Sequence, residues 1–342
     1  MKFDYLIKNG TLVFGEEVFS GDLGITDGKI SAAGRNLEGT SSTSTYDAAG
    51  CYVTPGFIDS HTHMSLPVSG TKSSDDFFTG GRAGAFGGVT TIVDFTTPEP
   101  GQTIPEAIKS RRKEAEICPI DFSFHGTLYG FSSVDPSELN QALELGVTSF
   151  KFFTAYGESD RRTPDGELLE AFRTIREMNG KCMVHCENDE IIQHEREKLR
   201  NAGKTSIEYH PVSRPDYSES EAVSRVIRLA SEPGGNLHLA HLTTKESIER
   251  LNSGKQSGIT LTGETCPQYL LLTEEEYEDE EGYLYSATPP LRRKEDRQAL
   301  WQGLKSGVID SVATDHCPFR NDQKEKFEDD FLNIPQGIPG IE

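Results

Sequence analysis

Residues 56–64 read GFIDSHTHM, in which two histidines, His61 and His63, stand two positions apart after an apolar run. On a helix, residues i and i+2 do not share a face, whereas on a β-strand they do because side chains alternate. If this stretch ends a strand, both imidazoles point the same way and could hold one ion between them. Two hydrogen-bonded surface histidines would give the same pattern, so the rest of the chain must distinguish these interpretations.

Composition excludes several classes of partner. The 342-residue chain carries 34 basic and 55 acidic residues, which gives a formal net charge of −21. Nucleic-acid surfaces need clustered lysine and arginine, so we expect no nucleic-acid partner. No run approaches the ~18 apolar residues of a membrane span, and charges interrupt the start of the chain, where a signal peptide needs an apolar core. We therefore expect a cytoplasmic protein with no membrane partner and with its 6 cysteines as reduced thiols.

From residue 52 onward, short β-branched or apolar runs alternate with longer segments of helical period. This alternation predicts a parallel sheet. Eight such units favour a closed (β/α)8 TIM barrel over an open doubly wound sheet, and the first turn lacks the G-x-G-x-x-G pattern of dinucleotide-binding folds. The expected strands are 52–58, 89–95, 121–128, 147–153, 181–186, 236–242, 258–265 and 308–314. The expected helices are 74–86, 104–116, 136–144, 165–179, 187–200 with 218–232, 244–254 and 292–305.

Residues 1–53 predict short strands at 3–8, 11–14, 22–25 and 29–32, with hairpin turns at Asn9-Gly10 and Asp27-Gly28. These strands are too few to bury two faces, so we expect them to be the N-terminal part of a small β-sandwich domain. Residues 54–342 would then form the barrel. Because no eighth helix pattern follows the last strand and the N-terminal strands lack partners, we expect the chain to be a C-terminally truncated version of a longer protein.

The residues at the carboxyl ends of the expected strands matter most, since barrel enzymes build their active sites on that face. Imidazole and carboxylate are ligands suited to borderline metals such as zinc. We expect Asp94 and His125 to be structural, and Asp59 to lie one layer below His61 as a support. The candidate ligands are His61, His63, Lys151, His185, His241 and Asp315.

Lys151 needs a separate explanation, because it lies inside an apolar strand, SFKFF. It could be a lysine that extends its stem along apolar surface and reaches solvent. Alternatively, desolvation beside metal ions would lower its pKa and leave a neutral amine. Such an amine can react with carbon dioxide to form a carbamate, an anionic two-oxygen ligand able to bridge two metals.

Several segments together resemble one known group of enzymes. PGFIDSHTH at 55–63 is similar to the first-strand motif of the amidohydrolase superfamily. The chain further resembles the D-hydantoinase and dihydropyrimidinase group from its first residues to its last. The matching segments are GTKSSDDFFTGGRAGAFGGVTTIVDF at 70–95, FKFFTAY at 150–156, VHCEN at 184–188, ETCPQYL at 264–270, TPPLR at 288–292 and ATDHCPF at 313–319.

This resemblance implies a dinuclear centre of two divalent ions, most often Zn2+, with Mn2+ or another metal as alternatives. His61, His63 and Asp315 match the ligands of the more buried metal, His185 and His241 match those of the second, and Lys151 matches an N6-carboxylated lysine that bridges both. The substrate contacts implied are Tyr156 on the carbonyl and its oxyanion, Thr288 where the family has serine, and Gln336 where it has asparagine.

The implied reaction opens a hydantoin or dihydropyrimidine ring to an N-carbamoyl amino acid. A hydroxide that bridges the metals attacks the carbonyl carbon, Tyr156 donates to the oxyanion, and Asp315 carries the proton to the leaving nitrogen. The partner expected is therefore a small cyclic amide, in a homotetramer or homodimer such as the group commonly forms.

Other functions fit less well. A dihydroorotase-like enzyme has an arginine soon after the H-x-H pair, whereas Met-Ser-Leu occupies 64–66. Allantoinase is a closer alternative, although residues 70–95 resemble it less. A non-catalytic dihydropyrimidinase-like assembly protein would have lost metal ligands, and all six positions are retained. A zinc deaminase would need P-C-x-x-C after the H-x-E at 185–187, but Cys266-Pro267 and Cys317-Pro318 occur in reversed order.

Overall fold

The computed structural model describes residues 2–37, 41–68 and 70–342. The chain divides into two compact units, Met1–Phe57 and Ile58–Glu342. The first unit is a mixed sheet in the order β3-β2-β1-β4, with β5 paired to β1. Its buried side chains include Phe3, Leu6, Leu12 and Leu23. The strands of this sheet are β1 (Lys2–Phe14), β2 (Glu17–Thr26), β3 (Lys29–Gly34), β4 (Ser41–Asp47) and β5 (Tyr52–Val53).

Of the two hairpins predicted in this unit, the one at Asp27-Gly28 is confirmed, since Thr26 pairs with Lys29 across it. The prediction at Asn9-Gly10 is wrong. Asn9 has the positive φ of 61° that a turn would need, but β1 runs on through it, and the pairing with β2 shifts there. The dipeptide is therefore a bulge, and the chain reverses instead between Phe14 and Glu17.

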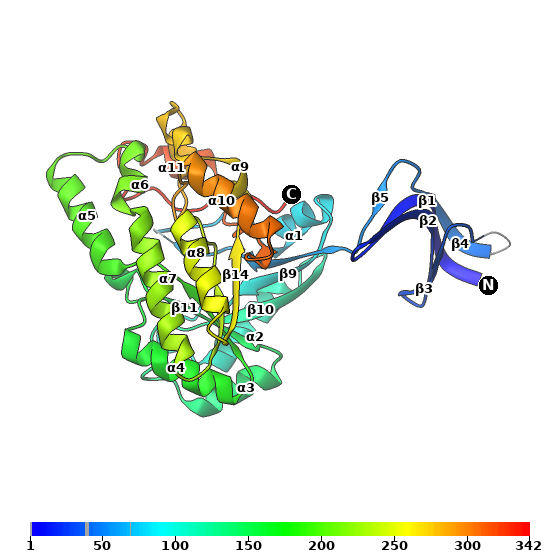
Figure 1. The fold of residues 1–342 in the computed structure, drawn as a ribbon, viewed down its shortest axis with the longest axis horizontal. Coiled ribbons are helices and arrows are strands. Elements are labelled where there is room, and N and C mark those ends of the chain that lie inside the picture. The colour runs from blue at the N-terminus through cyan, green and yellow to red at the C-terminus, as the bar shows by residue number, and fades with distance from the viewer. Residues whose placement is uncertain (1, 38–40, 69) are drawn as a thin grey trace. The chain divides into compact units, whose positions relative to one another are not determined.

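The second unit contains an eight-stranded parallel sheet in the order β15-β14-β13-β12-β11-β10-β9-β6 (Figure 1). A parallel bridge between Thr62 and His316 joins its two edges, and the His63 N–H donates to His316 O at 2.8 Å. The predicted fold class, a TIM barrel with a strand-rich N-terminal region, is confirmed. The barrel strands are β6 (Phe57–Thr62), β9 (Val89–Phe95), β10 (Asp121–Thr127), β11 (Ser149–Phe153), β12 (Lys181–His185), β13 (Asn236–Leu239), β14 (Thr260–Thr265) and β15 (Ser311–Val312).

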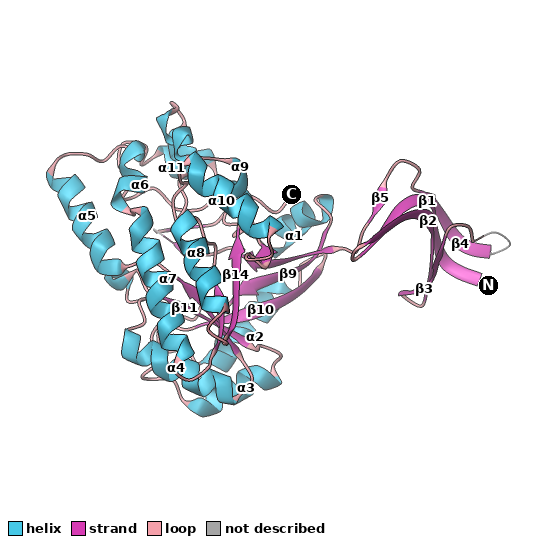
Figure 2. Ribbon diagram, viewed as in Figure 1, coloured by secondary structure: helices cyan, strands magenta, loops and turns pink. Residues whose placement is uncertain are grey.

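Helices cover the outside of this sheet, one or more after most strands (Figure 2). Their starts follow the sequence: at α2, Glu106 accepts a hydrogen bond from the Thr103 N–H at 2.9 Å, half of a capping box. All the predicted helices are present within a few residues. They are α1 (Phe77–Phe86), α2 (Ile104–Ala115), α3 (Pro136–Glu144), α4 (Asp165–Glu177), α5 (Asp189–Asn201), α7 (Asp216–Ser231), α8 (Lys245–Lys255) and α10 (Lys294–Lys305), with shorter α6 (His210–Ser213), α9 (Pro267–Leu271) and α11 (Asn321–Glu325).

Strand alternation determines which side chains enter the barrel. In β11, Phe150 and Phe152 are fully buried in the hydrophobic core that lies between strands and helices, so Lys151 points the opposite way, into the barrel. The same register pairs Phe153 of β11 with His185 of β12. The carboxyl ends of the strands therefore deliver these side chains to one end of the barrel.

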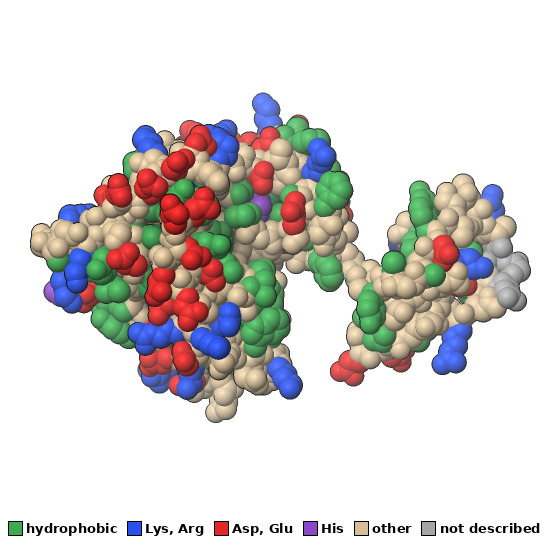
Figure 3. Space-filling model, turned by 90° about the horizontal axis from the view of Figure 1, so that it is seen from above, with side chains coloured by type: hydrophobic (Ala, Val, Ile, Leu, Met, Phe, Trp, Pro, Cys, Tyr) green, Lys and Arg blue, Asp and Glu red, His purple; other side chains and the backbone are tan. Residues whose placement is uncertain are grey.

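The surface carries the excess of acid that the sequence contains. Figure 3 shows acidic side chains spread across one face of the barrel unit, with basic side chains between them. None of the helices described is long and apolar enough to cross a membrane. The six cysteines are all free thiols, as predicted.

Candidate metal centre

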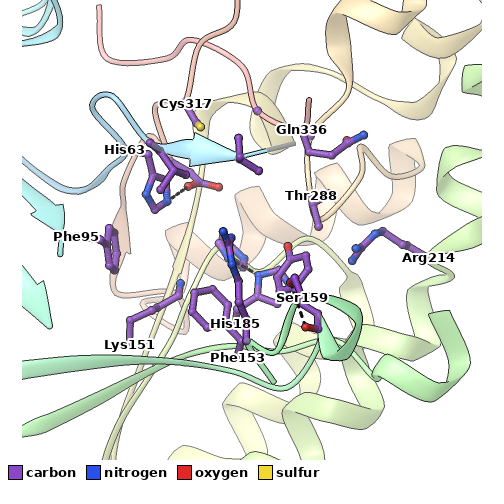
Figure 4. Close-up of a pocket in the computed structure, with 18 of the residues that line it drawn as sticks. His63, Phe95, Lys151, Phe153, Ser159, His185, Arg214, Thr288, Cys317 and Gln336 are labelled. Carbon is purple, nitrogen blue, oxygen red and sulfur yellow. Dashed lines mark hydrogen bonds and ion pairs between the residues drawn. The ribbon is translucent and has the colours of Figure 1, made fainter. Parts of the chain in front are cut away.

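One cavity of about 370 Å³ opens at the carboxyl end of the barrel strands (Figure 4). Its volume falls within the usual range for a small-molecule site. The structure brings every residue predicted from sequence as a ligand or substrate contact to this cavity. These residues are His61, His63, Lys151, Tyr156, His185, His241, Thr288, Asp315 and Gln336.

A first group forms around the carboxylate of Asp315. Its Oδ1 lies 3.2 Å from His61 Nε2 and 3.0 Å from His63 Nε2. Burial alone would raise the pKa of Asp315, but His61 and His63 hold it below its usual value, so the carboxylate is ionised. Burial also lowers the pKa of His63, which keeps that imidazole neutral near pH 7. The group therefore combines an ionised carboxylate with the neutral imidazole of His63.

A second group consists of His185 and His241. His185 Nδ1 lies 3.0 Å from His241 Nε2, and both rings are buried. His185 Nε2 lies 2.7 Å from Glu187 Oε2, so the ring donates its Nε2 proton to that carboxylate and presents the Nδ1 lone pair to His241. Burial lowers the pKa of both imidazoles, which are therefore neutral.

Lys151 lines the same cavity and is 2% exposed. Its Nζ is 5.3 Å from the centre of the Phe95 ring and 5.6 Å from that of Phe153. Among the described residues, no carboxylate forms an ion pair with it. Burial lowers the pKa of Lys151, so a neutral amine is favoured far more than at an exposed lysine.

The predicted substrate contacts, Tyr156, Thr288 and Gln336, also line the cavity. Tyr156 has a positive φ of 69°, and its ring centre lies 4.9 Å from that of His185. Thr288 Oγ1 and Gln336 Oε1 are buried and have no hydrogen-bond partner among the described residues. Gln336 Nε2 donates to Ile334 O at 2.9 Å, which fixes the side chain while leaving its oxygen free.

Three residues below the centre are structural, as the sequence predicted. Asp59 accepts hydrogen bonds from the backbone N–H groups of Thr314 (3.0 Å) and His61 (3.2 Å), and so ties β6 to the segment before Asp315. Asp94 accepts from the Met64 N–H at 2.8 Å and pairs with Arg111. His125 Nε2 lies 3.0 Å from Ser60 O, and burial lowers its pKa to about 4.

The sequence-based prediction missed a set of buried groups that orient the ligands. Glu264 Oε1 lies 2.5 Å from His61 Nδ1, and its Oε2 lies 3.1 Å from His238 Nε2. Glu187 binds His185 and also forms an ion pair with Arg214. Glu264 occupies the end of strand β14, so the rule that found the other residues would also have identified it. Arg214 follows helix α6, and nothing in its local sequence indicates this contact.

The donor atoms of the cluster fit divalent cations. Because His61 Nδ1 lies 2.5 Å from Glu264 Oε1, we assign the proton to Nδ1 and a lone pair to Nε2, which makes no hydrogen bond among the described residues. His241 Nδ1 is likewise buried without a partner among the described residues. Ligand atoms of His61, His241 and Asp315 all lie within 4.8 Å of one another. Lone pairs that face one another in a buried site repel unless a cation lies between them.

Comparisons with known proteins agree on one family. The family model described as "Amidohydrolase family" matches residues 52–335. A D-hydantoinase of Geobacillus stearothermophilus is 39% identical over 98% of this chain and 72% of its own length. A D-phenylhydantoinase of Escherichia coli is 38% identical over 98% of this chain and 73% of its own. The crystal structure of a dihydropyrimidinase from Brevibacillus agri, 35% identical, superposes with a TM-score of 0.95 over 98% of this chain and 74% of that one.

Proposed function

The chain belongs to the amidohydrolase family and is a cyclic amidohydrolase of the hydantoinase and dihydropyrimidinase group, and from this premise we propose how its own residues act. The reaction is hydrolytic opening of a hydantoin or dihydropyrimidine ring to an N-carbamoyl amino acid. The observation that carries the proposal is the single cavity in which neutral imidazoles, an ionised aspartate and a desolvated lysine converge.

We propose that His61, His63 and Asp315 hold one divalent ion and that His185 and His241 hold a second. Two such ions, most often zinc at sites of this kind, polarise a carbonyl group and lower the pKa of water. Lys151 would join the two sites as a carbamate. Its desolvation supports this step, since the free amine adds to carbon dioxide, forms an N–C bond and releases one proton.

The remaining residues would bind the ring and move protons. Burial raises the pKa of Tyr156, so its hydroxyl is protonated at neutral pH and can donate to the carbonyl oxygen as negative charge develops there. Asp315 is ionised and can accept the proton of the attacking water and pass it to the leaving ring nitrogen. The unpaired oxygens of Thr288 and Gln336 offer acceptors to the ring N–H groups.

The decisive test measures ring opening by ultraviolet absorbance with dihydrouracil, hydantoin, 5-substituted hydantoins, allantoin and dihydroorotate. We expect hydantoins or dihydrouracil to be opened, with activity lost on dialysis against a chelator and restored by Zn2+ or Mn2+. Opening of dihydroorotate alone would contradict the substrate group. Full activity after the metals are removed, as measured by elemental analysis, would contradict the metal assignment.

Two further proposals concern the whole protein. The cytoplasmic location expected from the sequence stays a prediction. A homo-oligomer is proposed from the resemblance alone. Light scattering of the purified protein measures the subunit number, and a monodisperse monomer at working concentration would contradict it.

A further inference from the structure

Three arginines, Arg161, Arg196 and Arg214, line the cavity together with Glu158. Two of the cations are neutralised. Arg196 Nη1 lies 2.6 Å from Glu158 Oε1, and Arg214 forms an ion pair with Glu187. Among the residues that the structure describes, Arg161 has no carboxylate partner. In a chain with a net charge of −21, an unpaired cation on the wall of the substrate cavity is an unexpected feature.

The position of Arg161 is set by its loop. The carbonyl oxygen of Tyr156 accepts hydrogen bonds from the backbone N–H groups of Ser159 and Arg161, both at 3.2 Å, so the chain turns back on itself there. Gly157 anchors the turn by donating to Asp189 Oδ1 at 3.0 Å, and a Cβ at this glycine would lie 2.6 Å from Asp189 Oδ2. The loop therefore keeps Arg161 close to Tyr156.

The guanidinium of Arg161 is also oriented. Its Cζ lies 5.6 Å from the centre of the Tyr129 ring, so one face is occupied by an aromatic side chain. A guanidinium held in this way keeps its edge N–H groups available for a planar, two-oxygen acceptor. Arg161 and Tyr156 both line the cavity.

The two ends of the cavity differ in a way that orients a substrate. Four of the candidate metal ligands, His61, Lys151, His185 and His241, are buried, whereas Arg161 is only half-buried. A ring whose carbonyl meets Tyr156 would extend its substituent toward the outer part. We propose that the preferred substrate is a hydantoin whose 5-substituent ends in a carboxylate, and that Arg161 binds this carboxylate. This inference rests on the proposed function, and the product would be the N-carbamoyl derivative of an acidic amino acid, formed with one water.

The test compares kcat/KM for 5-(2-carboxyethyl)hydantoin with that for its neutral isostere, 5-(2-carbamoylethyl)hydantoin, using the metal-loaded full chain. Hydrogen bonds to charged groups predict a preference for the carboxylate of about 10- to 100-fold. The preference should come mainly from a lower KM for the carboxylate substrate. It should fall below about threefold in Arg161→Gln, and Arg161→Lys, which keeps the charge without the planar fork, should keep an intermediate preference.

Arg173→Gln is the matched control, because Arg173 is a surface arginine paired with Glu232 at 3.1 Å and does not line the cavity. It should leave the preference unchanged. The inference is overturned if wild type opens hydantoin without favouring the carboxylate, or if Arg161→Gln keeps the full preference. If neither hydantoin nor dihydrouracil is opened by metal-loaded wild type, the proposed function fails and this inference with it, so the two failures are distinguishable.

Discussion

Glu264 is the buried carboxylate whose replacement best tests the candidate metal centre. It is fully buried, and burial alone would raise its pKa, but His61 and His238 hold the pKa well below its usual value. The ionised carboxylate accepts the Nδ1 proton of His61 at 2.5 Å. This contact fixes the tautomer that leaves Nε2 free for a metal and makes that nitrogen more basic.

Glu264→Gln keeps the shape and the acceptor oxygen but removes the negative charge. Losing such a partner of a metal-binding histidine typically weakens metal affinity by about 10- to 100-fold, which corresponds to about 1.4–2.7 kcal/mol. Glu264→Leu would be a poorer test. It leaves a buried nitrogen of His61 and one of His238 without a hydrogen-bond partner, at a cost of about 1–3 kcal/mol each. It would therefore lower the stability of the protein as well as its affinity for metal.

The assay is competition for Zn2+ against a chelator of known affinity at pH 7.5, with urea unfolding of the metal-free proteins in parallel. Asp22→Asn is the control, since Asp22 is a buried carboxylate in the other unit that accepts from the Asn9 N–H at 2.9 Å. We expect weaker Zn2+ binding in Glu264→Gln and unchanged binding in Asp22→Asn. Equal Zn2+ affinity in Glu264→Gln and wild type would refute the orienting role.

Two further predictions concern buried lysines. Lys151→Arg introduces a permanent cation that cannot form a carbamate, so the metal content should fall from about two ions per chain to about one or none. Elemental analysis checks this, and unchanged content would contradict the bridging role. Burial lowers the pKa of Lys324 from 10.5 to about 7. Below pH 7 the folded protein must bury a charged ammonium, which lowers its free energy of unfolding. Between pH 7 and 10.5 the amine is neutral in the folded protein but charged in the unfolded chain, so the free energy of unfolding rises with pH. The stability of wild type relative to Lys324→Met should increase by up to about 1.4 kcal/mol per pH unit in this window, and urea unfolding that gives a constant difference would rule this out.

Hydrophobic pattern predicted most of the barrel, because buried parallel strands and their covering helices have distinct periods. The first strand, expected at 52–58, is wrong: Tyr52–Val53 pair with β1 in the first unit, and the barrel strand is β6 (Phe57–Thr62). Strand β9 and helix α3 begin and end at the residues expected from sequence. The last strand is shorter than expected, although the Ala313 N–H still donates to Thr265 O at 3.1 Å, as a longer strand would. Asn9-Gly10 could not be interpreted from sequence alone, since a bulge and a hairpin turn both need a positive φ.

The same limit applies to the candidate site. Residues at strand ends could be placed from sequence, because a closed barrel brings those ends together. Contacts between loops could not, since they depend on how distant segments pack. Glu187 meets Arg214 across 27 positions, and Arg214 in turn accepts a hydrogen bond on its carbonyl oxygen from Arg292. No periodicity in the sequence relates these three residues.

The electrostatics of the centre connect these observations. Burial lowers the pKa of His63, His185 and His241, so the imidazoles are neutral, while Asp315 and Glu264 remain ionised. The polypeptide therefore surrounds the cavity floor with lone pairs and negative charge, and among the described residues neither Asp315 nor Glu264 forms an ion pair with a lysine or an arginine. Such an arrangement is costly in a low-dielectric interior unless ions bind to it. Burying ligand atoms without partners destabilises the metal-free protein. Because metal binding relieves this cost, the ligands, their supporting carboxylates and the desolvated lysine together increase the affinity for divalent metals.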